Sequence, residues 1–391
     1  MKRLIGLVLC LFVLLPLPCM ALQPAPEQAL TLSAPSALLM HMDGTVLYEK
    51  DAHRPMAPAS VTKVMTLLLA AEAIDAGQLS LTDVVTASAH ACSMGGSQVW
   101  LEEGEQMTVE QLLKCVVLAS ANDCAVALAE AVAGSEEAFV ARMNHRAQQL
   151  GMQNTKFVNC CGLDAQGHLT TAYDIALMSR ELMRHSWMEA YTTLWQDTIR
   201  DGAFTLTNTN KMIRHYDGMI GLKTGSTSGA GFCLSAVARR DGMTLVAVVL
   251  GAETSTKRTS DIRTLLDYGF ANYCELPIVP SDPLPEIRVR MGTKKTVPLM
   301  LGESSGILAE KSQAGTLVTH LDLETNLQAP VERGRQVGTL SVMEGDTVLR
   351  QVPVVAAEDC PRQTVGQIFL RLFSWLGMRK NEKIGKNMLS E

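Results

Sequence analysis

The 391-residue sequence lacks an excess of basic residues, the common metal-binding motifs and any repeated or low-complexity segment. Lysines and arginines number 34 against 40 acidic residues, and the net charge of −6 argues against a nucleic-acid partner, which would need a broad basic surface. Neither a Cys-x-x-Cys nor a His-Glu-x-x-His spacing occurs, so we expect no metal and no cofactor. The hydrophobic content of 47 % and the mean hydropathy of +0.12 exclude wholesale disorder.

Long apolar runs are also missing, except near the N-terminus. There, Lys2 and Arg3 precede an apolar run over residues 4–18 and the small residues Cys19 and Ala21. This three-part layout is typical of a signal peptide, and we expect residues 1–21 to be one, cleaved after Ala21. The run is shorter than the roughly 20 apolar residues of a membrane-spanning helix. Prolines around Cys19 disfavour a lipoprotein anchor.

Eight cysteines follow residue 21, without the dense spacing of a small disulfide-linked scaffold. An oxidising compartment would allow some of them to pair, but we expect most to be reduced and buried. For Cys161, burial as a small hydrophobic side chain, pairing and reaction at the thiol all remain open.

The length predicts two or three domains, and the first is expected over residues 25–276. It begins with a hairpin pattern over residues 36–50, around the turn pair Asp43-Gly44. Helical periodicity predicts a helix from about Ser60 to Gly77 and others over residues 112–118, 123–133, 136–150, 172–184 and 260–273. Strands are predicted over residues 219–223, 231–240 and 243–251. Strands at both ends with helices between them indicate an α/β (α+β) domain, in which a helical cluster covers an antiparallel sheet whose ends pair.

The C-terminal third has a different pattern. Four prolines predict a linker over residues 277–285. Short alternating stretches at residues 286–290, 316–322, 336–343 and 347–355 then predict a small all-β sandwich over residues 286–360. Residues 361–391 combine an apolar stripe at helical spacing with several lysines and arginines. They indicate an amphipathic helix that lies on a membrane surface or, alternatively, packs on the β domain.

Three short motifs carry the chemistry: Ser-x-x-Lys at residues 60–63, Ser-x-Asn at 120–122 and Lys-Thr-Gly at 223–225. At a helix start, Ser60 would present its hydroxyl beside unpaired N–H groups, and Lys63 lies on the same face one turn later. Lys63 can act as a base only in its uncharged form, so its pKa must fall from about 10.4 toward 7. Burial would lower this pKa, as would a second cation, for which Lys223 is the candidate.

Together the motifs resemble those of the D-alanyl-D-alanine carboxypeptidases, the low-molecular-mass penicillin-binding proteins with an extra β domain (type-5 subgroup). The resemblance rests on residues 58–63, 120–123, 162–165 and 217–225 and spans essentially the whole chain. It implies a penicillin-binding/transpeptidase-like fold and a serine peptidase that removes the terminal D-alanine from peptidoglycan pentapeptides. Ser60 would form the acyl-enzyme, with Lys63 as its base and Ser120 as the proton relay to the leaving amine.

The resemblance also implies how the substrate is held and where the protein acts. Asn122 would hold the acyl-side amide, and Lys223 and Thr224 would bind the terminal carboxylate. Gly225 would let the substrate backbone approach the strand. β-Lactam antibiotics would acylate the same serine. The implied location is the periplasmic face of the bacterial inner membrane, bound through residues 361–391.

An oxyanion hole is implied at the backbone N–H groups of Ser60 and Ser226. Two positions depart from the family pattern, because Cys161 stands where relatives commonly show His before Gly-Leu-Asp, and Ser226 stands where some carry His after Lys-Thr-Gly. These departures leave the hydrolysis rate and the substrate preference open.

Two other functions compete with this interpretation. A β-lactamase would acylate the same serine, but a class A enzyme needs a glutamate that positions water. Residues 159–170 contain no glutamate. A weakly active penicillin-binding protein that acts on wall shape is the second alternative, and the intact set of Ser60, Lys63, Ser120 and Lys223 weighs against it.

Overall fold

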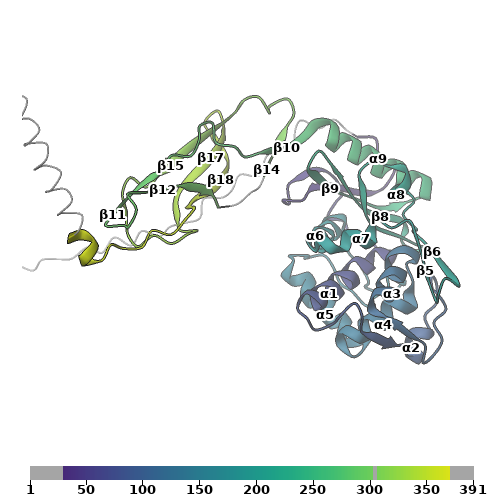
Figure 1. Cartoon of the computed structure of the whole chain (residues 1–391). Helices are drawn as coiled ribbons and strands as arrows, with labels where there is room; N and C mark the ends of the chain where they lie inside the picture. Colours follow the sequence, from purple (N-terminus) through teal and green to yellow (C-terminus); the bar gives the residue numbers. More distant parts are fainter. Residues whose placement is uncertain (1–29, 303–305, 370–391) are drawn as a thin grey trace, which may run out of the picture.

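The computed structural model describes residues 30–302 and 306–369. The predicted signal peptide and most of the predicted C-terminal helix therefore lie outside the described residues. The described chain forms a large α/β domain and a smaller β domain that projects from it (Figure 1).

A five-stranded antiparallel sheet in the order β2-β1-β9-β8-β7 lies at the centre of the large domain. Its strands are β1 (Ser36–His41), β2 (Val46–Lys50), β7 (Met219–Thr227), β8 (Gly231–Arg240) and β9 (Met243–Ala252). The predicted N-terminal hairpin is confirmed as β1 and β2, and β1 pairs with β9 from the far end of the domain. The two ends of the domain thus meet in one sheet.

Helices cover both faces of this sheet. The helices of this domain, some of which pack on other helices and not on the sheet, are η1 (Ala59–Thr62), α1 (Lys63–Asp75), α2 (Ala89–Cys92), α3 (Val109–Lys114), η2 (Cys115–Ala119), α4 (Asn122–Ala133), α5 (Glu136–Gln149), α6 (Ala172–Arg184), η3 (Ser186–Met188), α7 (Glu189–Thr192), α8 (Met212–His215) and α9 (Ser255–Asn272). Side chains alternate along each strand, so that Leu38 and Met40 enter the core shared with α1 and α6, whereas Ala37 and Leu39 enter the core shared with α9. Apolar burial on both faces makes the sheet a rigid platform.

Local sequence signals explain several helix boundaries. A capping box of Thr108 and Gln111 lies at the start of α3. α9 begins at Ser255 rather than near residue 260, because the Thr254 hydroxyl accepts a hydrogen bond from the Lys257 N–H at 3.1 Å and extends the helix by an exposed polar turn. Apolar periodicity does not mark that turn.

Two short ribbons were not predicted: β3 (Val84–Thr86) with β4 (Gln106–Thr108), and β5 (Gln196–Ile199) with β6 (Phe204–Thr207). Strand β7 also continues to Thr227, beyond its predicted end at Lys223, because pairing with β8 extends to the pair Thr227 and Gly231. The Lys-Thr-Gly motif therefore lies inside a strand.

The smaller domain is built from short sheets in the orders β13-β18-β17-β15, β12-β11-β16 and β10-β14. Its strands are β10 (Tyr273–Pro277), β11 (Ile287–Arg290), β12 (Thr296–Val297), β13 (Leu299–Leu301), β14 (Gly306–Glu310), β15 (Leu317–Leu323), β16 (Leu327–Gln328), β17 (Gln336–Glu344) and β18 (Thr347–Ala356). Its buried core includes Val297, Leu327, Val337 and Val354.

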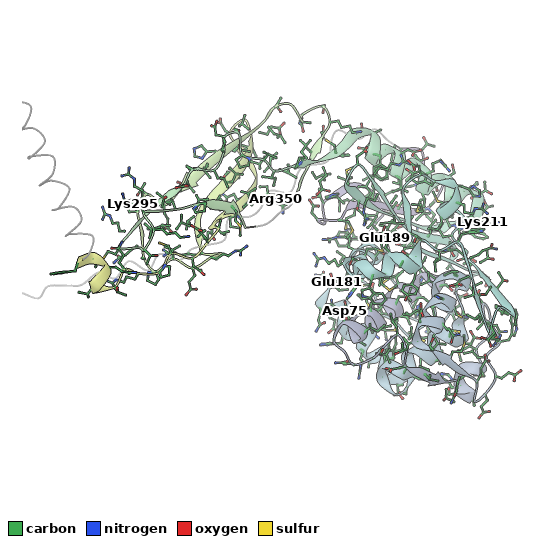
Figure 2. The ribbon with its side chains drawn as sticks, in the orientation of Figure 1. Asp75, Glu181, Glu189, Lys211, Lys295 and Arg350 are labelled. Atoms are coloured by element: carbon green, nitrogen blue, oxygen red, sulfur yellow. The ribbon has the colours of Figure 1, made fainter. Side chains whose placement is uncertain are left out.

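The junction between the domains is a paired strand. β10 follows α9 directly and pairs with β14, and Leu308 of β14 joins the core beneath α9. The Lys311 ammonium donates to the Phe270 carbonyl at 2.7 Å. On the other side, Arg350 of β18 donates to the Gly306 carbonyl at 2.9 Å (Figure 2). Pro277, the first residue of the predicted linker, is thus the last residue of β10, the strand that connects the two domains.

Candidate active site

Ser60 and Lys63 lie where the chain enters α1 beside the central sheet. Ala59, directly before Ser60, has a φ of 48°, a left-handed conformation that is strained for a residue with a Cβ. The Lys63 side chain is fully buried. Its Nζ lies 3.0 Å from Ser60 Oγ, so the predicted pair is in hydrogen-bond contact.

Two further oxygens hold the Lys63 amine. Nζ donates to Asn122 Oδ1 at 2.5 Å and to the Cys161 carbonyl at 2.7 Å. Both oxygens can only accept hydrogen bonds. An uncharged amine has two N–H groups, so both would be used on these oxygens and its lone pair would face Ser60 Oγ. The arrangement therefore orients neutral Lys63 to take the proton of Ser60.

The pKa of Lys63 is shifted in the direction that this chemistry requires. Burial lowers the pKa to about 8, although Cys161, Cys160 and the Asp123 carboxylate act in the opposite direction. At neutral pH the charged form still predominates, but the uncharged form is accessible at low energetic cost.

Ser120 and Asn122 are positioned by a distorted helix. The segment η2 is wound as a π-helix and is followed by Ser120, whose φ of 60° is left-handed. The buried Ser120 Oγ makes no hydrogen bond with any described residue. The Asn122 amide is engaged at both ends, because Nδ2 donates to the Gly95 carbonyl at 2.6 Å. In this structure Asn122 thus holds Lys63, and its predicted contact with substrate stays a prediction.

The Lys-Thr-Gly motif on β7 lies directly against the backbone of the Ser-x-x-Lys motif. A Cβ built on Gly225 would lie 2.9 Å from the Ser60 nitrogen and 3.0 Å from the Pro58 carbonyl oxygen. Glycine is therefore required for β7 to approach η1, in addition to its predicted role toward substrate. Next along the strand, the Thr224 hydroxyl donates to Thr209 Oγ1 at 2.8 Å, and Ser226 is exposed.

Lys223 is as deeply buried as Lys63. Burial lowers the pKa of Lys223 well below its usual range, and the positive charges of Lys63 and Arg258 lower it further. The effect of Lys63 on Lys223 is thus present, whereas burial alone lowers the pKa of Lys63, and the predicted lowering by Lys223 stays a prediction. A bound carboxylate would favour the charged form of Lys223.

Arg258 is a further candidate for the site, which the sequence analysis did not identify. Its Nε is buried and has no hydrogen-bond partner among the described residues. With Thr209 and Lys211 it lines a cavity of about 550 Å³ next to the Lys-Thr-Gly strand. Arg258 lies in the first turns of α9, and no motif in the sequence marks it.

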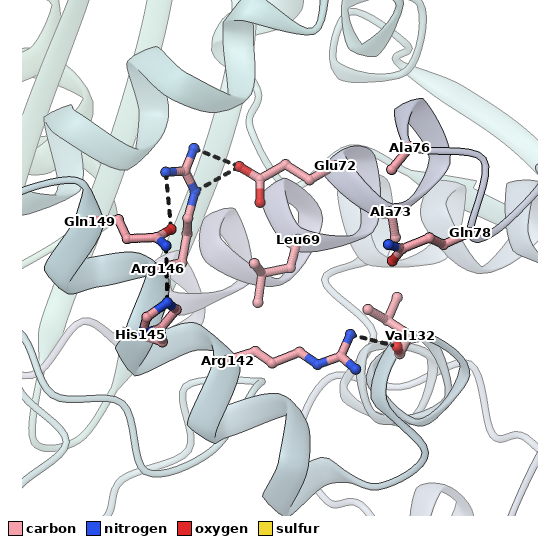
Figure 3. A pocket seen from close by; sticks show the side chains of 10 residues that line it. All are labelled: Leu69, Glu72, Ala73, Ala76, Gln78, Val132, Arg142, His145, Arg146 and Gln149. Atoms are coloured by element: carbon pink, nitrogen blue, oxygen red, sulfur yellow. Dashed lines mark hydrogen bonds and ion pairs between the residues drawn. The ribbon is translucent and has the colours of Figure 1, made fainter.

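A second cavity, of about 320 Å³, lies at the other end of α1 (Figure 3). Arg146 there bridges Glu72 and Glu181, with contacts of 2.7 and 2.8 Å. Ala73 lines this cavity ten residues after Lys63, which is about 15 Å along a helix axis. This cavity is separate from the serine–lysine site.

A buried lysine paired with a serine at a helix start, beside an antiparallel sheet, is the arrangement of a penicillin-recognising serine hydrolase. The family model described as D-alanyl-D-alanine carboxypeptidase matches residues 23–254, and that of the C-terminal domain of penicillin-binding protein 5 matches residues 277–362. This chain therefore belongs to the D-alanyl-D-alanine carboxypeptidase family and is a serine peptidase with the additional β domain.

Individual relatives agree with this assignment. The D-alanyl-D-alanine carboxypeptidase DacF of Bacillus subtilis is 41 % identical over 332 residues, which cover 83 % of this chain and 85 % of that protein. Penicillin-binding protein 5 from Haemophilus influenzae superposes with a TM-score of 0.72 at 28 % identity, covering 87 % of this chain and all of the other. The ampicillin-bound form of penicillin-binding protein D2 from Listeria monocytogenes gives a TM-score of 0.57 at 32 % identity, covering 63 % of this chain and all of that one.

Proposed function

We propose that this serine carboxypeptidase cleaves the terminal D-alanine from peptidoglycan pentapeptides through an ester on Ser60. The observation that carries the proposal is the setting of buried Lys63, whose Nζ lies 3.0 Å from Ser60 Oγ and is held by two oxygens that can only accept hydrogen bonds. Ser60 Oγ attacks the carbonyl between the two D-alanines while Lys63 takes its proton. The C–N bond then breaks, and Ser120 relays the proton held by Lys63 to the leaving amine, so that Lys63 is neutral again.

The second half of the reaction restores the enzyme. Water attacks the Ser60 ester and loses a proton to neutral Lys63, which returns it to Ser60 Oγ as the ester C–O bond breaks. The shortened peptide leaves as an acid and ionises to a carboxylate in solvent. The N–H groups of Ser60 and Ser226 are proposed to stabilise the oxyanion in both halves, a contribution of about 3 kcal/mol for each donor.

Recognition of the terminal carboxylate is proposed to involve Lys223, Thr224 and also Arg258. The support for Arg258 is its unpaired, buried Nε and its electrostatic contact with Lys223. Two cations beside one strand suit a substrate that ends in a carboxylate. A β-lactam carries a carboxylate as well, and the ampicillin-bound relative supports the proposal that β-lactams acylate Ser60.

The decisive experiment measures D-alanine release from a peptide that ends in D-Ala-D-Ala. We expect the purified chain to release D-alanine and Ser60→Ala to lose the activity, while Ser312→Ala, an exposed serine of the β domain, matches the parent. Retention of activity in Ser60→Ala would refute the proposal.

Exposure to labelled penicillin separates the alternatives. A long-lived adduct on Ser60 favours the carboxypeptidase, and fast turnover of penicillin favours the β-lactamase. An adduct without measurable D-alanine release would indicate the weakly active protein that acts on wall shape.

We also propose export and attachment to the periplasmic face of the inner membrane through residues 361–391. The described part of this segment becomes helical at residues 365–369, and Val365 and Phe369 are 82 % and 61 % exposed. Among the described residues, no helix has the length and apolar character needed to cross a bilayer. Surface attachment through an amphipathic segment is compatible with this finding.

A further inference from the structure

A cluster of three metal-ligating side chains lies behind the active site. Glu136 is the first residue of α5, and Cys160 and Cys161 precede the turn at Gly162. The two Sγ atoms and a carboxylate oxygen of Glu136 all lie within 4.8 Å of one another. In a tetrahedral zinc site with bonds of about 2.3 Å, neighbouring sulfur ligands are separated by about 3.8 Å. Small side-chain rotations would bring all three donors onto one ion.

We propose that Glu136, Cys160 and Cys161 bind one thiophilic divalent cation, of which Zn²⁺ is the representative. Two thiolates and a carboxylate suit such an ion, and they leave a fourth position for water. The sequence contains no corresponding motif, because the two parts of the cluster are 24 residues apart.

The carboxylate is already held in place for this role. Glu136 Oε1 accepts a hydrogen bond from the Cys160 N–H at 3.0 Å, and Oε2 lies 2.7 Å from His90 Nε2. Such partners orient ligands in known metal sites.

The thiols are buried, and their neighbour Glu136 borders a cavity. Cys160 and Cys161 are 0 % and 1 % exposed, whereas Glu136 and His90 line a cavity of about 560 Å³ together with Glu130. The acidic lining attracts cations.

The bound ion would stabilise the scaffold of the active site. The Cys161 carbonyl holds Lys63, the Cys160 carbonyl accepts from Thr66 Oγ1 at 2.6 Å, and a Cβ on Gly162 would overlap the Ala59 carbonyl. The segment thus supports both members of the serine–lysine pair. An ion bound to Glu136 and both cysteines would link this segment to the start of α5.

The net charge of the cluster predicts that ion binding would not change the pH dependence of acylation. As each metal–sulfur bond forms, the thiol loses its proton to solvent. The two charges of the ion are matched by two new thiolates, so the net charge of the cluster stays as it was with neutral thiols. We therefore expect the ion to raise the thermal stability of the protein without moving the pH dependence of Ser60 acylation.

The test is a titration of the reduced, metal-free full chain with Zn²⁺ and with Cd²⁺. We expect one ion per chain, release of protons, a thiolate-to-Cd²⁺ charge-transfer band in the ultraviolet, and a higher Tm with Zn²⁺. Cys160→Ser and Cys161→Ser should each weaken binding at least about 100-fold, and Glu136→Gln about 10- to 100-fold. Cys274→Ser, a cysteine at the domain junction, should bind as the parent does.

Several outcomes would overturn the proposal. These are absence of binding at micromolar Zn²⁺, equal binding by the parent and Cys160→Ser, or a mass two hydrogens lower that shows a Cys160–Cys161 disulfide in the purified protein. Glu136→Gln keeps the hydrogen-bonding shape of the side chain, so it remains informative if a cysteine variant fails to fold. Binding is measured without substrate and does not depend on whether Ser60 is acylated.

Discussion

Two buried lysines within electrostatic reach of each other place opposite demands on the active site. Lys63 must be uncharged to take a proton from Ser60, whereas a charged Lys223 attracts a carboxylate. The structure already lowers the pKa of both amines by burial. A substrate carboxylate would favour charged Lys223, whose charge would in turn disfavour charge on Lys63. Binding of the correct substrate would thus increase the fraction of Lys63 that can act as a base.

The pH dependence of acylation follows from the pKa of about 8 at Lys63. Below this pH Lys63 is mostly protonated and cannot accept a proton, so the acylation rate should rise about tenfold per pH unit and level off above pH 8. Stopped-flow acylation by a chromogenic β-lactam between pH 5.5 and 9.5 measures this profile. A rate that falls across this range would contradict the role of Lys63 as a base.

Asn122→Asp tests the role of Lys63 as a base by changing a side chain that contacts its amine. A carboxylate of nearly the same shape, placed 2.5 Å from Nζ, would stabilise the charged amine and raise the pKa of Lys63. We expect acylation at pH 7 to fall by about 10-fold or more, and the profile to move to higher pH. Asn144→Asp, which lies on α5 and contacts the Phe157 backbone, serves as the control. An unshifted profile in Asn122→Asp would show that the amide does not control Lys63.

At the scale of elements, the site depends on how closely β7 approaches η1. Gly225 permits this approach, and the paired strands β8 and β9 behind β7 keep it rigid. The turn at Gly162 also packs closely against this helix start, because a Cβ on Gly162 would overlap the Ala59 carbonyl. Ser60 is therefore fixed between a strand and a turn, each of which needs a glycine there.

Gly225→Ala should separate the strand from the nucleophile. The new Cβ would meet the backbone of Ser60 and Pro58 at 2.9 and 3.0 Å, so we expect a loss of about 1–3 kcal/mol in stability. Acylation should fall at least about 100-fold, because a shift of about 1 Å in the reacting groups has effects of this size. Acylation kinetics and denaturant unfolding measure the two effects.

Gly221→Ala is the matched control on the same strand. Its Cβ would lie 3.5 Å from the nearest side chain, which is an ordinary contact. Equal damage from Gly221→Ala and Gly225→Ala would indicate a general weakening of β7 instead of a specific approach to Ser60.

The sequence predicted local elements better than contacts between distant ones. Motif residues were assigned to the correct helix starts, since capping and periodicity are local properties, and α6 was predicted with its observed bounds. Arg258 and the continuation of β7 were missed because they depend on partners far along the chain. The pairing of β10 with β14 was missed for the same reason, since a strand next to prolines is recognised only when its partner is present.

At the scale of the whole molecule, backbone hydrogen bonds hold the chain to the β domain up to residue 363, just before the helical residues 365–369. Isolated bridges pair Val331 with Cys360 and Gly292 with Arg362, and the Gln363 N–H donates to the Met291 carbonyl at 2.8 Å. The described site residues from Pro58 to Arg258 all belong to the large domain. Catalysis and membrane attachment are therefore expected to be separable.

A truncation that ends at Thr364 tests this separation. It keeps the contacts at residues 360–363 and removes residues 365–391, which are most of the proposed membrane-binding segment. We expect D-alanine release to stay within about twofold of the full chain, and sedimentation with vesicles that contain anionic lipids to fall by at least about tenfold. Phe369→Glu in the full chain should weaken sedimentation in the same direction without removing any other residue. If the truncated protein sediments as the full chain does, residues beyond Thr364 do not mediate attachment, and the apolar and basic pattern there must instead serve packing.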